Sequence, residues 1–403
     1  MERNAAIAGL TLATTTLQGR FRELIEKVAA DAGPVVLLID EYDKPLVDFL
    51  NDPDRLEANR SVMKSFYSVL KGRDEHIRLL FVTGVSRFSR VSIFSDLNNL
   101  EDITIDRNFH ALVGITQAEL ETVFAAEIES LSGEYTDILR QIKEWYNGYS
   151  WGNVGQRLYN PFSLLNLMKG RTFMNYWFTT GTPTFLLEQL KKRKLSDMDS
   201  VEISLNALAD FNTDRLNMAS LLFQTGCLTI KALEGQLCTL GYPNREVRQS
   251  LLDGLLDIYR ESDVTDSLSL VTSLRKSLAS GDVGRAVAVL NSLIGDIPYD
   301  YWNADKESIF TIITVLSFKL AGVDAYTEVH SSKGRCDVLV RTDDYIYVIE
   351  IKLDGTAQEA LAQVLRQDYL QPYGGDKRKK LAIGISFSSA ARKVAEYLVQ
   401  EVG

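Results

Sequence analysis

The first part of the chain alternates between two patterns of apolar positions. Apolar residues recur at helical spacing in Leu17–Ala30 and again in Arg60–Lys71. Val35–Ile39 is a short, wholly aliphatic run, which is typical of a buried parallel strand, and Leu79–Thr83 predicts a second buried strand. The order helix, strand, helix, strand predicts an α/β domain with a parallel sheet over residues 1–115.

Helical patterns dominate the middle of the chain, residues 116–300. This segment opens on Thr116 and Glu119, which have the spacing of a capping box at a helix N-terminus. The helices predicted after it are Leu120–Leu131, Tyr135–Tyr146, Pro161–Met168, Thr184–Lys192, Val247–Tyr259 and Val283–Leu293. Clusters of aromatic and turn residues separate them, as at Trp145–Tyr149. We interpret these clusters as packing corners rather than as surfaces on which nucleobases stack.

Residues 301–403 predict a third module that mixes strands with helices. The predicted strands are Ala325–Val329, Cys336–Arg341, Tyr345–Leu353 and Lys380–Phe387. The predicted helices are Trp302–Leu320, Gln358–Tyr369 and a closing helix, Ala390–Val402. The fold class expected from the whole chain is therefore multidomain, with an α/β domain, a central helical domain and a C-terminal α/β domain.

Composition narrows the classes of protein that the chain can represent. Hydrophobic residues make up 45% and charged residues 24%, as in ordinary globular domains. The net charge of −10 argues against a histone-like protein that coats nucleic acid, but it is compatible with a local basic groove. Three cysteines and three histidines, with no CxxC pair, argue against a disulfide framework or a Cys/His zinc site. The few, scattered cysteines lead us to expect a protein of the reducing cytoplasm. We expect no membrane span, because Val35–Ile39, the longest aliphatic run near the start, is far shorter than the ~20 residues that a span needs.

The strand predicted at Tyr345–Leu353 ends in two charged residues. Side chains alternate along a strand, so Glu350 and Lys352 share a face. If Asp343-Asp344 forms a tight hairpin turn, Asp337 lies directly across from Glu350. Facing carboxylates repel each other unless a cation lies between them, and Mg²⁺ prefers such oxygen ligands. Spacing alone fits a charged sheet edge, with Lys352 paired to a carboxylate, equally well.

The C-terminal residues resemble the PD-(D/E)XK nuclease superfamily. The resemblance is strongest to the nuclease-like module that follows an AAA-ATPase-like domain in a group of mostly bacterial proteins. The matching strings are Gly334–Asp337, Ile349–Lys352, Ala360–Gln363 and Ile383–Phe387, with Tyr369 and Tyr373 between the last two. The spacing is kept over the whole C-terminal module, for which the resemblance implies a restriction-endonuclease-like α/β fold.

This resemblance implies a metal site and a role for each of its residues. Asp337 and Glu350, helped by the carbonyl of Ile351, would bind Mg²⁺ or Mn²⁺. Lys352 would position or activate the water that attacks a phosphodiester. These roles would make the module a metal-dependent nuclease.

The resemblance also points to residues on the neighbouring elements. Glu307, on the helix before the sheet, would match an outer acidic residue of the site, and an exposed helix charge is the alternative. Gln363 would match a site glutamine on the helix that follows the catalytic strand, with a helix-surface amide as the alternative. Glu328 is a further candidate.

At the other end of the chain, Val35–Ile39 and Asp40-Glu41 have the pattern of a Walker B strand. Ligands of open α/β sheets bind at the carboxyl ends of the strands, where Asp40 would hold Mg²⁺ through water. Glu41 would polarise the attacking water. Thr83, at the end of the next strand, would be a sensor residue, and Arg87 would face a γ-phosphate.

The same N-terminal segment resembles the AAA-ATPase-like family. The matching strings are Asp40–Leu46 and Thr83–Phe88, together with the aromatic clusters of the middle segment. The family's phosphate loop, GxxxxGK[ST], is nevertheless absent from the sequence. We therefore expect a chain that begins inside the ATPase domain and does not bind ATP by itself, with Asp40-Glu41 kept by structural contacts.

The function expected from these features is a metal-dependent DNA phosphodiesterase tied to a degenerate or truncated AAA-like domain. The first alternative is an ATP-binding regulatory or defence protein whose C-terminal module binds nucleic acid without cutting it. The second is a non-catalytic interaction protein or the product of a decaying pseudogene, which need not bind Mg²⁺ or Mn²⁺. Nucleic acid, in particular DNA, is the expected partner, and self-association through the AAA-like domain stays open.

Overall fold

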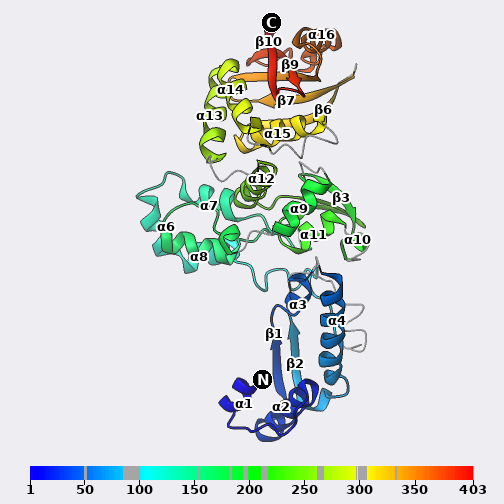
Figure 1. Ribbon diagram of the computed structural model, residues 1–403. Helices are drawn as coiled ribbons and strands as arrows, with labels where there is room; N and C mark the ends of the chain where they lie inside the picture. The colour runs from blue at the N-terminus through cyan, green and yellow to red at the C-terminus, as the bar shows by residue number, and fades with distance from the viewer. Residues whose placement is uncertain are drawn as a thin grey trace. The chain divides into compact units, whose positions relative to one another are not determined.

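The computed structural model describes residues 1–49, 52–84, 100–152, 155–180, 184–193, 198–209, 217–260, 267–295, 297, 306–331 and 334–402 (Figure 1). These residues form two compact units, each assembled from separate stretches of the sequence. The first unit comprises residues 1–125, 147–161 and 199–243, and the second comprises 126–146, 162–198 and 244–403. The mixture of helices and sheets confirms the expected α/β character of the chain, and its division into the three expected domains remains a prediction.

A parallel pair of strands lies at the centre of the N-terminal segment. Its elements are α1 (Glu2–Ile7), α2 (Leu17–Ala32), β1 (Val35–Ile39), α3 (Lys44–Val47), α4 (Pro53–Tyr67), η1 (Ser68–Leu70), η2 (Asp74–His76) and β2 (Ile77–Val82). In the parallel ladder, Val36 lies next to Leu79 and Ile39 next to Val82. This confirms the expected order of helix, strand, helix and strand.

Among the residues that the structure describes, only one face of strand β1 packs against a core. Val35, Leu37 and Ile39 pack against the core that α2 and α4 supply, in which Ile25 is buried. On the opposite face Leu38 is 73% exposed, so the expectation of a fully buried strand is wrong. The reason is that the described helices pack against a single side of this two-stranded sheet.

A small antiparallel sheet in the first unit corrects the expectation of a purely helical middle segment. Its strand order is β3 (Val201–Ser204), β5 (Leu237–Gly241) and β4 (Thr229–Glu234). The turn between β4 and β5 contains Gly235, whose φ of +61° is easily adopted only without a side chain. The first unit also contains the helices α5 (Gln117–Val123), α10 (Leu205–Ala209) and α11 (Met218–Gln224).

The expected helices of the middle segment are present. They are α6 (Ala125–Ser132), α7 (Ile138–Tyr146), α8 (Pro161–Gly170), α9 (Thr184–Lys192), α12 (Arg245–Arg260) and α14 (Val283–Gly295). A short 3-10 helix, η3 (Trp177–Thr180), lies in one of the aromatic clusters and was not predicted. Thr116 and Glu119 form the predicted capping box at the start of α5. The side chains of Tyr146 and Tyr159 are almost completely buried, as the interpretation of packing corners requires.

The C-terminal module contains a five-stranded sheet in the order β10-β9-β8-β7-β6. Its strands are β6 (Asp324–Ser331), β7 (Gly334–Arg341), β8 (Tyr345–Leu353), β9 (Lys379–Ser388) and β10 (Lys393–Val402). Strands β8 and β9 are parallel, and the other neighbouring strands are antiparallel. The expected strands are therefore confirmed, but the predicted closing helix is wrong, because Lys393–Val402 pairs with β9 as a strand.

Helices cover both faces of this sheet. The helices of the segment are α13 (Ser267–Ser280), α14 (Val283–Gly295), α15 (Lys306–Leu320), α16 (Ala357–Gln367) and η6 (Gln371–Tyr373). Tyr347 and Ile349 of β8 face α13 and α14. Ile346 and Val348, on the opposite face, pack with the residues of α16. Strand β8 is thus buried on both sides, as its sequence predicts.

Helix α14 also contacts the last strand through a side chain. The amide of Asn291 accepts the backbone N–H of Val394 at 2.7 Å and donates to the carbonyl of the same residue at 3.5 Å. Val394 lies next to a bulge in the β9–β10 ladder. A side-chain amide therefore takes both backbone hydrogen bonds of this residue.

Two further expectations concern the membrane and the domain boundaries. No helix in the described ranges combines the length and the apolar character that crossing a bilayer requires. The boundaries at residues 115 and 300 remain a prediction. Helices α13 and α14, which lie before residue 300, pack against the C-terminal sheet.

Candidate active site

The β7–β8 hairpin brings the predicted carboxylates together. Val338 pairs with Ile349, and this register continues to Arg341 and Ile346, as the tight turn at Asp343-Asp344 predicts. The described ladder ends at Val338. Beyond it, the Asp337 carboxylate accepts the backbone N–H of Ile351 at 2.8 Å, which ties Asp337 to the strand that carries Glu350.

Glu350 is a buried acid whose pKa is strongly shifted. Its side chain is 3% exposed, and Lys352 Nζ lies 3.2 Å from its Oε1. Burial, with a smaller contribution from the charge of Asp337, raises the pKa of Glu350 to about 7, although Lys352 acts in the opposite direction. An ion pair between Lys352 and a carboxylate was the alternative to a metal site. The structure contains this ion pair, and it also brings the carboxylates of Asp337 and Glu350 to the same strand.

Helix α16 brings Gln363 to the same carboxylate. The side chain of Gln363 donates a hydrogen bond to Glu350 Oε1, so this residue lies in the site. Thr356 and Glu359 form a capping box at the start of α16, and Glu396 of β10 accepts the N–H of Ala357 there at 3.1 Å. These contacts fix the beginning of the helix that carries the glutamine.

Close packing of α16 on the sheet depends on Gly384. This residue of β9 is the neighbour of Glu350 in the parallel ladder. A Cβ atom at Gly384 would overlap the carbonyl oxygen of Ala357 and the amide nitrogen of Leu361. The absence of a side chain therefore lets the helix backbone approach the strand, so that Gln363 can reach Glu350.

Two residues near the site were not assigned a role from the sequence. Tyr369 is 5% exposed, hydrogen bonds with Gln363, and has its pKa raised by burial and by the charges of Glu350 and Asp337. The sequence did point to Tyr369, which is among the residues that carry the resemblance to the nuclease superfamily. No feature of the sequence pointed to Glu396, because its contact with Ala357 depends on the pairing of β10 with β9.

The donor set of the site fits a hard cation. Glu350 Oε2 is buried without a hydrogen-bond partner among the described residues, while Oε1 contacts Lys352 and Gln363. An unmatched, buried carboxylate oxygen is costly, and a divalent cation removes that cost. Within the described part of the chain, however, no three His, Cys, Asp or Glu side chains gather as a metal cluster would.

The outer candidates are only partly described. Glu307 lies on α15 and Glu328 on β6, but the side chains of both fall outside the described part of the structure. Their roles, and that of the Ile351 carbonyl as a metal ligand, remain predictions.

The N-terminal candidates lie together at the carboxyl ends of β1 and β2. Thr83 Oγ1 donates to Asp40 Oδ1 at 2.5 Å, and the same carboxylate oxygen accepts the N–H of Glu41 at 2.9 Å. Glu41 is exposed and has a φ of +50°, in the left-handed region that few non-glycine residues adopt. Arg87 lies outside the described residues.

Comparisons with known proteins agree with this organisation. A family model described as "Predicted AAA-ATPase" matches residues 2–94, and one described as "PD-(D/E)XK nuclease superfamily" matches residues 305–397. The "Uncharacterized protein in vnfD 5'region" of Azotobacter chroococcum mcd 1 is 33% identical over 417 residues, which cover 99% of this chain and 78% of that protein. No solved structure matches significantly. The chain belongs to a family of proteins in which a predicted AAA-ATPase domain precedes a C-terminal PD-(D/E)XK nuclease superfamily domain.

Proposed function

We propose that the chain is a metal-dependent nuclease that hydrolyses phosphodiester bonds of DNA through its C-terminal module. Asp337 and Glu350, with the carbonyl of Ile351, would hold Mg²⁺ or Mn²⁺. The bound ion would supply Lewis-acid stabilisation of the charge that develops on the phosphate. The N-terminal segment would act as a regulatory domain.

The observation that carries the proposal is the buried oxygen Glu350 Oε2, which has no hydrogen-bond partner in the described structure. Its neighbour Oε1 is held by Lys352 and Gln363, so the orientation of the carboxylate is fixed before any cation arrives. Asp337 raises the cost of ionising Glu350. A cation beside the two carboxylates would lower the Glu350 pKa and stabilise both charges.

The protein groups around the carboxylates have separate tasks in this proposal. Lys352, which lies beside Glu350, would orient the attacking water and stabilise negative charge on the phosphate. Gln363 would keep Glu350 Oε1 in place. Glu307 would act as an outer acidic residue on α15.

The test is cleavage of supercoiled plasmid and of single-stranded DNA in Mg²⁺ or Mn²⁺. The wild type is compared with Glu350→Ala and Lys352→Ala, and with the controls Glu401→Ala and Lys393→Ala, which remove exposed charges from β10. We expect cleavage to fall by roughly 10²-fold or more in the two site variants, to stop in EDTA, and to persist in both controls.

Two results would contradict the proposal. Equal cleavage by all five proteins would assign the activity to another site or to a contaminant. Absence of cleavage, together with absence of Mn²⁺ binding by calorimetry, would favour a non-catalytic interaction module.

For the N-terminal segment we propose a more limited role. Asp40 and Thr83 would keep the arrangement of a Walker B acid and a sensor residue, with Glu41 and Arg87 beside them. The hydrogen bond between Thr83 and Asp40 supports this pairing. Because the sequence contains no GxxxxGK[ST] loop, we expect neither ATP binding nor ATP hydrolysis by this chain alone. Equilibrium dialysis with labelled ATP tests this, and saturable binding would contradict it.

A further inference from the structure

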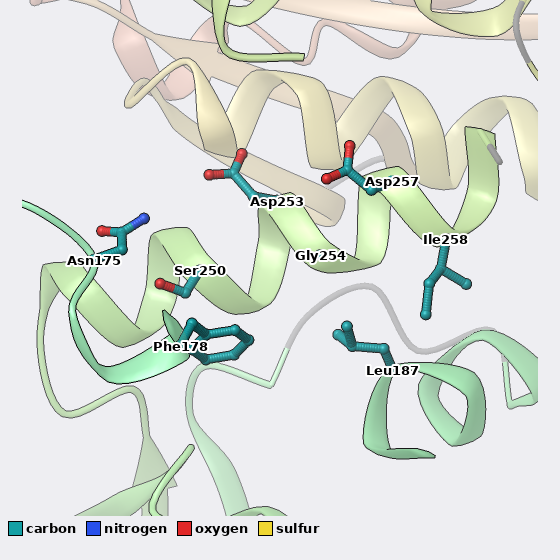
Figure 2. A pocket seen from close by; sticks show the side chains of 8 residues that line it. All are labelled: Asn175, Phe178, Leu187, Ser250, Asp253, Gly254, Asp257 and Ile258. Carbon is teal, nitrogen blue, oxygen red and sulfur yellow. The ribbon is translucent and has the colours of Figure 1, made fainter. Parts of the chain in front are cut away.

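A cavity of about 320 Å³ lies beside α12 in the second unit. Figure 2 shows that Asp253 and Asp257 project from one side of α12, whereas Phe178 and Leu187 lie on the other. The polar groups of a ligand site converge on a common space with its apolar lining. The groups around this cavity do not, so we assign no ligand to it.

Polar side chains converge instead in the C-terminal sheet, where a row of them crosses three strands beside the candidate site. Lys352 of β8 lies next to Ser386 of β9, and Ser386 lies next to Glu396 of β10. Neighbouring residues of a ladder share a face of the sheet, and α16 covers this face. The row therefore lies below the loop that joins β8 to α16, residues 354–356.

The backbone of this loop is strained. Its first residue, Asp354, has a φ of +53°, in the left-handed region that few non-glycine residues adopt. Such a conformation persists where the surrounding structure holds it. The N–H of Asp354 donates to the carbonyl of Phe387 at 2.8 Å, and the Asp354 carboxylate accepts the N–H of Ser389 at 2.8 Å. The conformation of the loop thus depends on its contacts with the sheet.

Ser386 holds the middle of the loop over Lys352. Ser386 is 4% exposed, and its hydroxyl donates to the carbonyl oxygen of Gly355 at 2.6 Å. Gly355 in turn lies against the stem of Lys352, since a Cβ atom at Gly355 would be 3.1 Å from Lys352 Cβ. The stem has little room on that side, which favours the orientation in which Lys352 Nζ contacts Glu350.

Glu396 holds the end of the loop, where α16 begins. The first N–H groups of a helix have no partner within the helix, and negative charge is favoured beside them. Glu396 Oε2 accepts the N–H of Ala357, the first residue of α16, at 3.1 Å. Because α16 carries Gln363, which donates to Glu350, a shift at the start of the helix would move this donor relative to the carboxylate.

We propose that Ser386 and Glu396 are positioning residues of the candidate active site. Ser386 sets the position of Lys352 through Gly355, and Glu396 sets the position of Gln363 through the start of α16. Both act through the loop rather than by contact with the substrate. This inference rests on the nuclease activity proposed above.

The first experiment measures DNA cleavage by variants that remove each contact. Ser386→Ala and Glu396→Ala are compared with the controls Ser389→Ala, which keeps the backbone N–H that Asp354 uses, and Glu401→Ala, at an exposed position of β10. We expect the first two to lower the cleavage rate at saturating DNA by about 10- to 100-fold, with the KM for DNA unchanged. Both controls should cleave as the wild type does.

Two further variants test how Glu396 acts. Glu396→Gln keeps an oxygen that can accept the N–H of Ala357, so we expect it to cleave within about threefold of the wild type. The double variant of Glu396→Ala with Gln363→Ala should cleave at the rate of Gln363→Ala alone, because both changes remove the same contact with Glu350.

Hydrogen exchange of the metal-free protein gives a readout that does not depend on cleavage. In Glu396→Ala we expect the amides at the start of α16 to exchange about fivefold faster or more, and those of β7 to exchange at the wild-type rate. In Glu401→Ala both segments should keep the wild-type rate.

The outcomes separate this inference from the proposed function. Cleavage and exchange at wild-type rates in Ser386→Ala and Glu396→Ala would overturn the positioning roles and leave the nuclease activity standing. A raised KM with an unchanged cleavage rate would also overturn them, because it would assign the residues to DNA binding. Absence of cleavage by the wild type would refute the proposed function, and the positioning roles with it.

Discussion

Glu350 of β8 and Gly384 of β9 are direct neighbours in the parallel ladder of the C-terminal sheet. One residue is the buried acid of the candidate site, and the other makes room for the helix that supplies Gln363. The position of α16 over the acid therefore depends on a residue that has no side chain.

Gly384→Ala tests this dependence. The added methyl group would overlap backbone atoms of α16, which cannot move as a flexible side chain can, so the helix must shift. We expect a loss of about 1–3 kcal/mol in the free energy of unfolding and a large loss of cleavage. The control is Gly375→Ala, because a Cβ there has no neighbouring atom within 4 Å. Equal behaviour of the two variants would contradict the packing argument.

Gln363→Ala tests the contact with Glu350. Losing a partner that orients a metal-binding carboxylate commonly costs about 10- to 100-fold in metal affinity or activity. We expect a reduction of this size in cleavage and in Mn²⁺ affinity, with the fold retained. Gln358→Ala removes an exposed glutamine from the same helix and should change neither quantity. Wild-type cleavage by Gln363→Ala would place this residue outside the site.

Thr83→Val removes the hydroxyl that joins the ends of β1 and β2 at Asp40. Because this hydrogen bond is partly exposed, we expect the free energy of unfolding to fall by about 1 kcal/mol. This loss corresponds to roughly fivefold faster hydrogen exchange in the peptide that covers Val35–Ile39. Thr83→Ser keeps the hydroxyl and should restore the protection. If the Val variant exchanged at the wild-type rate, the hydrogen bond would make no net contribution.

Glu246 predicts a pH dependence of stability that is separate from the candidate active site. This residue of α12 is fully buried and accepts the N–H of Trp177 at 2.9 Å, and burial raises its pKa to about 7. The native state then binds the Glu246 proton more tightly than the unfolded chain does, so stability is lost as the pH rises from about 5 through 7.

The measurement compares the wild type with Glu246→Gln by urea unfolding between pH 5 and pH 8. We expect the difference in free energy of unfolding to move in favour of the Gln variant by about 1–3 kcal/mol over this range. Glu401→Gln, a change at an exposed position, should follow the wild type at every pH. A constant difference between wild type and Glu246→Gln would show that the carboxyl titrates near its ordinary value.

The sequence predicts the core of the candidate site well, because local rules decide it. Alternation along Tyr345–Leu353 places Glu350 and Lys352 on one face, and the tight turn at Asp343-Asp344 determines the register opposite β7. The contact of Gln363 follows from the resemblance rather than from any pattern. The role of Gly384 depends on how closely α16 approaches β9, which a sequence pattern does not encode.

The predictions of secondary structure are wrong where strand pairing between distant segments outweighs the local pattern of apolar residues. Val394, Leu398 and Val402 have the four-residue spacing of a helix, yet their segment completes the sheet beside β9. The sheet in the middle segment contains a glycine turn at Gly235 between two short strands, which is a usable hairpin signal that the dominant helical patterns concealed.

The bond between Asn291 and Val394 has a consequence for how the molecule avoids unwanted assembly. β10 is the last strand of its sheet, and the free side of an outer strand can template the addition of another chain. Beside the bulge, the amide of Asn291 occupies both the donor and the acceptor of Val394, much as a neighbouring peptide group would. A strand from a second copy that paired with β10 would find the backbone N–H and C=O of Val394 already hydrogen bonded, so its ladder would be interrupted there. Helix α14 thus makes this one residue of the border less available for pairing with another chain.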